Sequence, residues 1–326
     1  MKEKKLQATL NAKKDWKIKF DNKQHCRLKR NAAEHYRSNR IKMNTEYKGI
    51  KISEDTKFEN MDFVQYDFSM SDLSEVVFEN VNFSNCTFNK TVCKKTRFWG
   101  CFFEDCIFSR VDLSDTYIGA WGGGQNNCKF VKCKLGKTFG GSYITNAVFD
   151  HCKIKGCIFS CLYMENVRFS GLIDDLMIRK MSIKEITRNQ TAAKATKIIA
   201  KILRVIKQDN IDVPKVQVNG IDFSSATMQF LDFSECELQH IIPPTDDKHL
   251  LIDKDLYEIT KCVSDEIKNS WYNADNQSWA LNCVNNIQKE APTAIVCWQD
   301  FKHFEDEVFA DKLMELFRKA KKEYGR

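Results

Sequence analysis

Several features that mark common protein classes are scarce or missing in this sequence. Its 326 residues include only 4 prolines and contain no run of eighteen apolar residues, so we expect no membrane-spanning helix. Met1-Lys2-Glu3-Lys4-Lys5 lead into no apolar run, which predicts a cytoplasmic protein without a signal peptide. The 14 cysteines form no Cys-x-x-Cys pattern, and this disfavours a structural zinc site.

No cofactor or metal site is predicted elsewhere either. Gly136-Lys137-Thr138 has the end of a phosphate-binding loop, but the glycine required five positions earlier is Val131. Asp300, His303, Asp306 and Glu307 have helical spacing, which is more typical of an exposed acidic helix start than of a metal centre.

Phenylalanine, by contrast, is abundant, with 23 residues, and many of them recur at a fixed spacing. A period of five fits neither the 3.6 residues of a helical turn nor the alternation of a flat strand. It predicts a coil with four five-residue sides, each contributing one inward residue to a structural ladder. These inward residues are Phe58, Phe63, Phe68, Leu73, Phe78, Phe83, Phe88, Cys93, Phe98, Phe103, Phe108, Leu113 and Ile118.

A second period, of twenty residues, supports the square coil. Phe63, Phe83 and Phe103 would stack on one face, two further faces repeat phenylalanine in the same way, and the fourth is largely aliphatic. Successive coils would then hydrogen-bond backbone to backbone at about 4.8 Å spacing and bury a continuous core.

The tracts around these positions resemble the pentapeptide-repeat family, whose repeat reads roughly small residue, Asp or Asn, Leu or Phe, then two variable positions. Met61-Asp62-Phe63, Val81-Asn82-Phe83, Val111-Asp112-Leu113 and Ile221-Asp222-Phe223 match this repeat. The resemblance implies a mainly β fold, a right-handed quadrilateral β-helix, in a bacterial scaffold protein for protein–protein interaction. It says little about a particular function, because this fold has many uses.

Many cysteines occupy the small inward position two residues before a ladder residue, where cysteine acts as a compact apolar side chain. Without an export signal we expect these thiols to be reduced. The cysteines at this position are Cys86, Cys101, Cys106, Cys128, Cys133, Cys152, Cys157 and Cys236.

Charge is distributed unevenly along the chain, which has a formal net charge of +7. Residues 1–50 carry fifteen Lys and Arg against five Asp and Glu. Within the repeats, residues 51–88 carry two against eight, whereas residues 89–173 carry twelve against six. The solenoid therefore begins acidic and becomes basic.

Two basic segments are candidates for partner contacts. In the N-terminal arm, a helix from Lys23 to Met43 would present Arg27, Arg30, Arg37 and Arg40. After Thr191 an apolar helical stripe is backed by Lys194, Lys197, Lys201 and Arg204. Both patterns are typical of solvated faces, and the alternative is binding to phosphate-rich partners.

The five-residue phase is interrupted twice before residue 173. Gly119 to Asn127 predicts a loop at a coil corner, with Trp121 either as a contact residue or folded back on the rod. A second disruption is expected from Lys137 to Tyr143, after which Phe149, Ile154, Phe159, Met164 and Phe169 resume the pattern.

The last third of the chain is expected to end the solenoid and cap it. Proline at Pro243 and Pro244 cannot donate to a next rung, and helical stripes follow. One stripe is Leu256, Ile259, Val263, Ile267 and Trp271; a second is Trp279, Cys283 and Ile287; a third is Val308, Phe309, Leu313, Leu316 and Phe317. The segment from Thr293 to Trp298 predicts a short strand.

The predicted organisation has five segments. They are a basic arm or cap (1–50), a pentapeptide-repeat β-helix (51–173), a helical insertion (174–210), final β-helix coils (211–242) and a mainly helical C-terminal domain (243–326). An exposed end coil is an open sheet edge, which gives the C-terminal cap a physical role.

These observations favour a non-enzymatic protein that binds a macromolecular partner, expected to be a protein, along its rod, loops and cap. One alternative is a DNA-mimicking modulator of a topoisomerase such as gyrase, with a homodimer through the C-terminal helix. A second is a nucleic-acid binder acting through residues 1–50 and 194–204. A third is an effector or defence protein with activity in the C-terminal domain, for which Cys297 is the candidate nucleophile.

Overall fold

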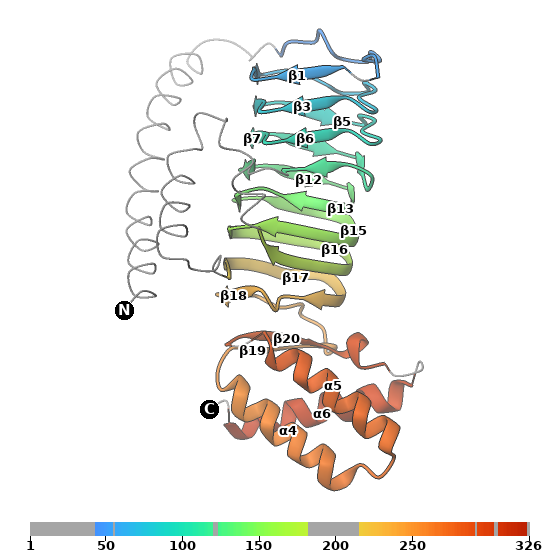
Figure 1. The fold of residues 1–326 in the computed structure, drawn as a ribbon, viewed down its shortest axis with the longest axis vertical. Coiled ribbons are helices and arrows are strands. Elements are labelled where there is room, and N and C mark those ends of the chain that lie inside the picture. Colours follow the sequence, from blue (N-terminus) through green and yellow to red (C-terminus); the bar gives the residue numbers. More distant parts are fainter. Residues whose placement is uncertain are drawn as a thin grey trace, which may run out of the picture.

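The structure, a computed structural model, describes residues 43–54, 56–119, 123–181, 215–290, 292–302 and 306–324. In these residues the chain forms a β-solenoid of about seven turns, followed by a C-terminal domain with three helices. Figure 1 shows the coils stacked in chain order from blue to yellow, with the orange and red helices across the end of the stack. The predicted mainly β solenoid fold is therefore confirmed.

The solenoid strands form one 18-stranded sheet in which neighbouring coils pair in parallel. Most early strands are only three residues long because the chain turns a corner after each one. The strands are β1 Lys57–Glu59, β2 Asp62–Val64, β3 Val77–Glu79, β4 Asn82–Ser84, β5 Thr87–Asn89, β6 Arg97–Trp99, β7 Phe102–Glu104, β8 Ile107–Ser109, β9 Asp112–Leu113, β10 Tyr117–Ile118, β11 Gly124–Asn126, β12 Lys129–Val131, β13 Lys134–Gly140, β14 Tyr143–Thr145, β15 Val148–Cys161, β16 Tyr163–Lys180, β17 Val216–Asp232 and β18 Cys236–Gln239.

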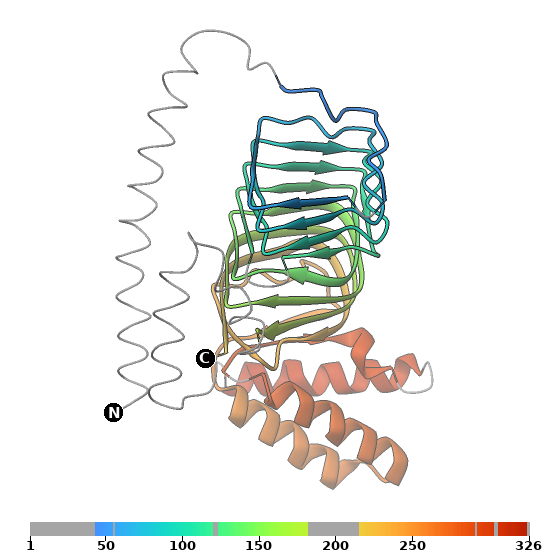
Figure 2. The ribbon, with the colours of Figure 1, turned by 45° about the horizontal axis from the view of Figure 1, so that its top comes forward.

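The predicted ladder residues stack inside the coils. Phe63 pairs in register with Phe83, and Phe83 with Phe103. Their rings are stacked, with centroids 5.4 Å and 4.9 Å apart. All three side chains are buried, so the core is a set of continuous aromatic columns held by dispersion and the hydrophobic effect. Figure 2 shows the strands of successive coils lying side by side, across the rod and stacked along its length.

The corners between sides depend on left-handed backbone conformation. The residue two positions after a ladder residue repeatedly has positive φ, as at Asn80 (54°), Asn85 (55°) and Lys90 (54°). A left-handed residue lets the chain change direction within one position, and Asn and Gly adopt this conformation most readily.

The predicted cysteine positions are confirmed. Cys86, Cys101 and Cys106 are buried free thiols, and each donates to the carbonyl oxygen of a ladder residue in the coil before it. The weak S–H donor therefore bridges neighbouring coils from the small inward position.

The break predicted from Gly119 to Asn127 is shorter than expected. Strand β11 resumes the ladder within it, and the buried Gln125 takes an inward position, its Nε2 donating to the Gly140 carbonyl oxygen at 2.6 Å. A polar residue at a ladder position concealed this coil from the pattern of apolar residues. Trp121 lies outside the described residues.

The disruption predicted from Lys137 to Tyr143 is a single register shift and not a break in the solenoid. Strand β13 crosses most of it, and Phe139 and Ile144 are buried ladder residues. The register of β13 against β15 shifts between Leu135 and Lys137. This bulge shortens the step from Leu135 to Phe139 to four residues, so the strict period of five missed it.

The solenoid also continues past the boundary predicted at residue 173. Strand β16 runs to Lys180, and Ile173, Leu176 and Ile178 are buried in the core. A second four-residue step, from Phe169 to Ile173, explains why the pattern ended early. The helix predicted after Thr191 lies outside the described residues.

The C-terminal domain packs a small sheet and three helices around its own apolar core. Antiparallel strands β19 and β20 form the sheet, and a short 3-10 helix, η1, follows β20. The elements are β19 His249–Ile252, α4 Leu256–Ser270, α5 Ala274–Gln288, β20 Ala294–Cys297, η1 Trp298–Phe301 and α6 Glu307–Tyr324. Ile295 of β20 reaches into the solenoid core, so the domain is joined to the rod by apolar contacts.

Two of the predicted helical stripes need correction. In α5 the residues buried in the core are Ala280 and Val284, whereas Trp279 is exposed. In α6 Val308 is 77% exposed, although Phe309 is buried as predicted. The core face of α5 is therefore rotated by one residue, whereas in α6 only Val308 was misplaced, because large apolar residues also occur on the solvent side.

Candidate functional site

The predicted partner-contact residues cannot define a site in this structure. Like Trp121, the basic residues of both predicted segments lie outside the described residues; they are Arg27, Arg30, Arg37, Arg40, Lys194, Lys197, Lys201 and Arg204. His303 lies outside as well. The candidate sites below are therefore built from the solenoid surface and from its junction with the C-terminal domain.

One corner of the solenoid carries a basic residue on three successive coils. We call Lys90, Arg110 and Lys132 the basic ridge. Each has positive φ, at 54°, 56° and 52°, and each side chain is exposed. Their backbone N–H groups donate to the next coil at 2.8 Å, that of Lys90 to Ser109 O and that of Arg110 to Val131 O. The backbone ladder thus places the three basic side chains one above another, at about the 4.8 Å strand spacing.

The basic ridge differs from its neighbours in charge pairing. On the adjacent side, Lys95 pairs with Glu75 at 3.1 Å and Lys134 pairs with Asp112 at 3.1 Å. Within the described part of the chain, no ridge residue lies within ion-pair distance of a carboxylate. The ridge therefore presents positive charge without a direct ion pair, as Lys94, Lys129 and Lys153 also do in the described segments. Lys132 acts on Asp150 only at longer range and helps to lower the pKa of that carboxyl group.

Apolar side chains lie beside the ridge. Ile107, 42% exposed, precedes Phe108 in β8, and its register partner in the next coil is Lys129. Val92, 50% exposed, lies on the other side of the corner. Basic groups next to exposed aliphatic groups form a surface that can attract an acidic partner and bury apolar area against it.

We call a different side of the rod the acidic face, because its strands hold two carboxylates, Asp62 and Glu104, and no basic residue. Strands β2, β4, β7, β11 and β14 stack on one face and contain no Lys or Arg. Asp62 accepts from Asn82, and Glu104 accepts from Asn126 at 2.9 Å. Asn146 continues this ladder of side-chain amides by donating to Asn126 at 3.0 Å. The face is thus a regular array of amide and carboxylate oxygens.

At the end of the rod the C-terminal domain pairs with the open edge of the last coil. Asp300 Oδ1 accepts from the Phe230 N–H at 2.7 Å, and Glu290 Oε1 from the Phe233 N–H at 3.5 Å. These carboxyl groups take the place of the next coil's carbonyl groups. These two contacts cover part of an edge that would otherwise be open to pairing with another chain.

Burial changes the acidity of both carboxyl groups. Glu290 is only 9% exposed, and its burial, with the charges of Asp232 and Asp300 nearby, raises its pKa to about 8. Burial likewise raises the pKa of Asp300 to about 6, despite the hydrogen bond from Phe230. A neutral Glu290 carboxyl group is therefore favoured at neutral pH.

A cavity of about 210 Å³ lies at this junction. Its wall combines apolar side chains with the two carboxyl groups and two thiols. The lining residues are Phe230, Leu231, Cys283, Asn286, Ile287, Glu290, Ile295, Cys297, Asp300 and Phe301. Glu290 Oε2 is buried and forms no hydrogen bond of ordinary geometry, although the Ile295 backbone N–H lies close enough to the carboxyl group to lower its pKa. An incompletely satisfied polar group therefore lies beside the cavity.

Cys297, the candidate nucleophile, lies in a row with a histidine and an aspartate. Its Sγ is 3.5 Å from His249 Nε2, and His249 Nδ1 is 2.7 Å from Asp246 Oδ1. However, the thiol donates to the Met228 carbonyl oxygen at 3.3 Å and is 2% exposed. Burial raises its pKa to about 12. A catalytic cysteine needs the opposite shift, so this row acts as a further contact between the cap and the last coil.

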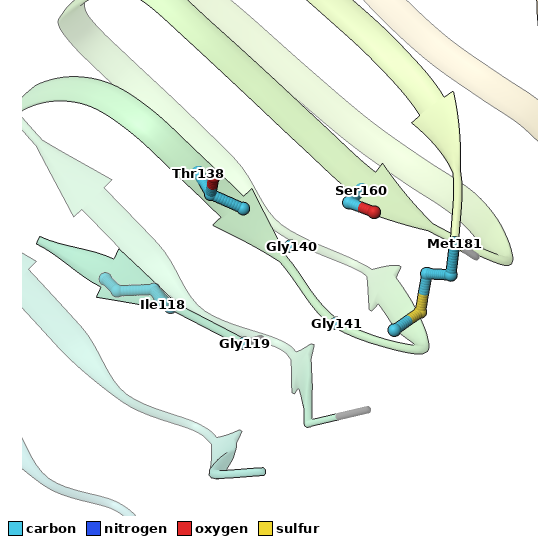
Figure 3. Close-up of a pocket in the computed structure, with 7 residues that line it drawn as sticks. All are labelled: Ile118, Gly119, Thr138, Gly140, Gly141, Ser160 and Met181. Carbon is cyan, nitrogen blue, oxygen red and sulfur yellow. The ribbon is translucent and has the colours of Figure 1, made fainter. Parts of the chain in front are cut away.

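Figure 3 shows a second, much smaller cavity beside Gly119, Gly140 and Gly141 on neighbouring coils. A Cβ on Gly119 would lie 1.6 Å from the Gly140 carbonyl oxygen, so the coils approach too closely here for any other residue. The cavity of about 10 Å³ has room for about one water molecule. It is a packing feature of the glycine-rich corner.

No group of three or more His, Cys, Asp or Glu side chains in the described segments is arranged to hold a metal ion. No helix in those segments combines the length and apolar character needed to cross a bilayer.

Sequence reasoning missed both the ridge and the cavity. Lys90 and Arg110 are twenty residues apart and could have been aligned, but Lys132 is displaced by the two residues inserted after Ile118. The sequence places Asp300 in an acidic cluster but does not indicate its contact with the solenoid. Glu290 gave no signal, because nothing in its local sequence shows that a tertiary contact buries it.

Comparison with known proteins gives the family and little more. Residues 54–89 match the pentapeptide-repeat family, described as "Pentapeptide repeats", in eight copies. No curated protein sequence matches the chain.

Three solved structures illustrate the similarity at the level of structure. A trypsin-treated QnrB1, a plasmid-mediated fluoroquinolone resistance protein, is 15% identical, with a TM-score of 0.36 over 60% of this chain and 90% of that one. HetL, involved in heterocyst differentiation regulation in the cyanobacterium Nostoc sp. strain PCC 7120, is 11% identical, with a TM-score of 0.28 over 65% and 91%. A pentapeptide-repeat protein of the Arabidopsis thaliana thylakoid lumen is 15% identical, with a TM-score of 0.11 over 48% and 90%.

These TM-scores and identities carry no argument about function. The assignment follows from the repeat match and from the square coils with their ladder of buried phenylalanines. The chain is a pentapeptide-repeat protein.

Proposed function

We propose that this protein is a non-enzymatic binding protein whose solenoid docks the acidic surface of a protein partner on the basic ridge. The observation that carries the proposal is the column of Lys90, Arg110 and Lys132 on successive coils, unpaired within the described part of the chain while nearby lysines form ion pairs. An acidic partner would supply the missing counter-charges.

The rod makes this surface rigid. Each ridge residue belongs to a coil whose backbone is hydrogen-bonded to the next, as from Lys132 N to Asp150 O at 2.8 Å. The spacing between the basic groups is therefore set before binding. Only side-chain freedom is lost when a partner docks, which reduces the entropic cost of association.

A protein partner is favoured over nucleic acid by the apolar neighbours of the ridge. Ile107 and Val92 are exposed beside it, and a protein partner can bury them while its carboxylates meet Arg110 and the lysines. Phosphate binding alone would leave these aliphatic groups in water. Binding through residues 1–50 and 194–204 stays a separate hypothesis on residues outside the described segments.

The test compares two variants with equal net charge. Lys90→Asn, Arg110→Asn and Lys132→Asn remove the ridge charges, and Asn suits the left-handed backbone at all three positions. The control carries Lys95→Asn, Lys134→Asn and Lys137→Asn, which remove lysines that form ion pairs with Glu75, Asp112 and Asp115.

Binding of a fluorescent poly-glutamate peptide is measured by anisotropy for both variants, with duplex DNA as a second probe. We expect the ridge variant to bind the peptide about tenfold more weakly than the control. Equal affinities of the two variants, or binding of DNA in preference to the peptide, would contradict the proposal.

The acidic face supports a second candidate, a DNA-mimicking modulator of gyrase. Its five stacked strands carry no Lys or Arg, and they contain two carboxylates, Asp62 and Glu104, which lie two coils apart. A supercoiling assay with purified gyrase decides this candidate. It is rejected if the protein neither inhibits supercoiling nor protects the enzyme from a quinolone.

The remaining hypotheses are weaker. An effector activity through Cys297 is disfavoured by the raised pKa of its thiol. A homodimer through α6 stays a prediction, for which the exposed Val308 offers an apolar contact. A cytoplasmic location and a bacterial origin also stay predictions.

A further inference from the structure

The junction cavity between the last coil and the C-terminal domain contains a buried acid that its structural role does not fully use. Glu290 Oε1 caps the Phe233 N–H, but Oε2 is buried and forms no hydrogen bond of ordinary geometry. An incompletely satisfied buried carboxyl oxygen is destabilising unless something else satisfies it. The space of about 210 Å³ beside it is large enough to hold such a group.

We propose that this cavity binds a small organic cation, an aromatic or aliphatic amine. Its ammonium group would contact Glu290 and Asp300, and its apolar body would pack against Phe230, Ile287 and Phe301. This site is separate from the basic ridge and does not depend on the function proposed for it.

The charges around the cavity favour a positively charged ligand. No Lys or Arg is among the residues that line it, and Asp232 and Asp300 add negative charge near Glu290. A carboxylate ligand would be repelled, whereas an ammonium group would meet two acceptors in a poorly solvated site. The aromatic rings of Phe230 and Phe301 offer further attraction to a cation.

The volume and lining select the size and shape. A cavity of about 150 Å³ lined by apolar groups holds benzene, and drug-sized ligands need roughly 300 Å³ or more. The junction cavity, at about 210 Å³, fits one ring with a short amine. Phe230, one of the lining residues, is 50% exposed.

Proton release should accompany binding. In the empty site Glu290 holds its proton below about pH 8, and a bound ammonium would favour the ionised form. Affinity should therefore rise between about pH 6 and pH 8 as the carboxyl group gives up its proton more easily. The other titratable groups near the site are Asp232, Asp300, Cys236, Cys283, Cys297 and His249.

The experiment is calorimetric titration of the full chain with benzylamine, with benzyl alcohol as a neutral probe of nearly the same shape. We expect benzylamine to bind about tenfold more tightly than benzyl alcohol. Glu290→Gln should remove this difference, because the amide keeps the acceptor for Phe233 but not the charge. Glu266→Gln, on the exposed side of α4, is the matched control and should bind as the unchanged protein does.

A second variant tests the location without touching the acid. Ile287→Trp would fill the cavity and should abolish benzylamine binding, also in the event that Glu290→Gln does not fold. The proposal is overturned if the unchanged protein does not bind benzylamine, if benzyl alcohol binds equally well, or if Ile287→Trp binds benzylamine as before.

Discussion

An interior coil and the last coil of this solenoid have similar cores but differently closed edges. Inside the rod, each coil pairs with the next through backbone groups, as from Phe102 N to Val81 O at 3.0 Å. At the end of the rod, side chains accept these hydrogen bonds: Asp300 accepts from the Phe230 N–H and Glu290 from the Phe233 N–H. Backbone pairing is available to any sequence, whereas side-chain pairing needs particular groups and leaves a cavity with buried acids.

The largest difference should appear when an aromatic column is cut. Phe83 is fully buried between Phe63 and Phe103. Phe83→Ala should lower the free energy of unfolding by about 3–5 kcal/mol, because it removes a large side chain and leaves a cavity in close-packed surroundings. Denaturant unfolding measures the loss.

Phe102→Ala is the control, since that ring lies on the outside of the next coil and is only half-buried. It should cost about 1 kcal/mol or less. Similar losses from both variants would mean that the columns do not dominate the stability of the rod.

A smaller effect is expected at the closed edge. Asp300→Ala removes the acceptor for the Phe230 N–H and should destabilise the protein by about 1–3 kcal/mol. Asp300→Asn keeps an acceptor oxygen and should cost less. If Asn and Ala were equally damaging, the charge of Asp300 rather than its hydrogen bond would be holding the cap. Urea denaturation of the two variants distinguishes these outcomes.

The junction should also make stability depend on pH in a way that interior coils do not. The folded pKa of Glu290 is about 8 and that of Asp300 about 6, above their ordinary values of 4.5 and 3.8. A carboxyl group with a raised pKa in the folded state contributes stability that is full below its unfolded pKa. This contribution is lost as the pH rises through the folded pKa.

Unfolding free energy should therefore fall between about pH 4.5 and pH 8. Glu290→Gln should flatten this dependence, and thermal unfolding across the range measures it. A variant profile parallel to that of the unchanged protein would show that Glu290 does not titrate in this window.

The same contrast explains what the sequence could predict. Ladder positions such as Phe83 repeat with their surroundings every twenty residues, so a simple period reveals both the residue and its neighbours. The four-residue steps before Phe139 and Ile173 could not be predicted from the sequence, because the position of a bulge depends on pairing with the neighbouring coil. The burial of Glu290 could not be predicted for a related reason, since it depends on how α5 and β20 pack against the end of the rod.

The basic ridge falls between these cases. The backbone ladder that positions Lys90 and Arg110 was predictable, but the absence of nearby carboxylates in the described segments became visible only in three dimensions. Ridge substitutions should leave unfolding free energy within about 0.5 kcal/mol of the unchanged protein, because the side chains are exposed. Their effect should be on binding alone.

The most direct test of the proposed binding surface measures lysine reactivity in the unchanged protein. An amine-acylating reagent is applied with and without the poly-glutamate peptide, and labelling of each lysine is followed by mass spectrometry. The account predicts that the peptide slows labelling of Lys90 and Lys132 and leaves Lys95 and Lys134 unaffected. Equal protection of all four, or protection of Lys95 and Lys134 alone, would contradict it.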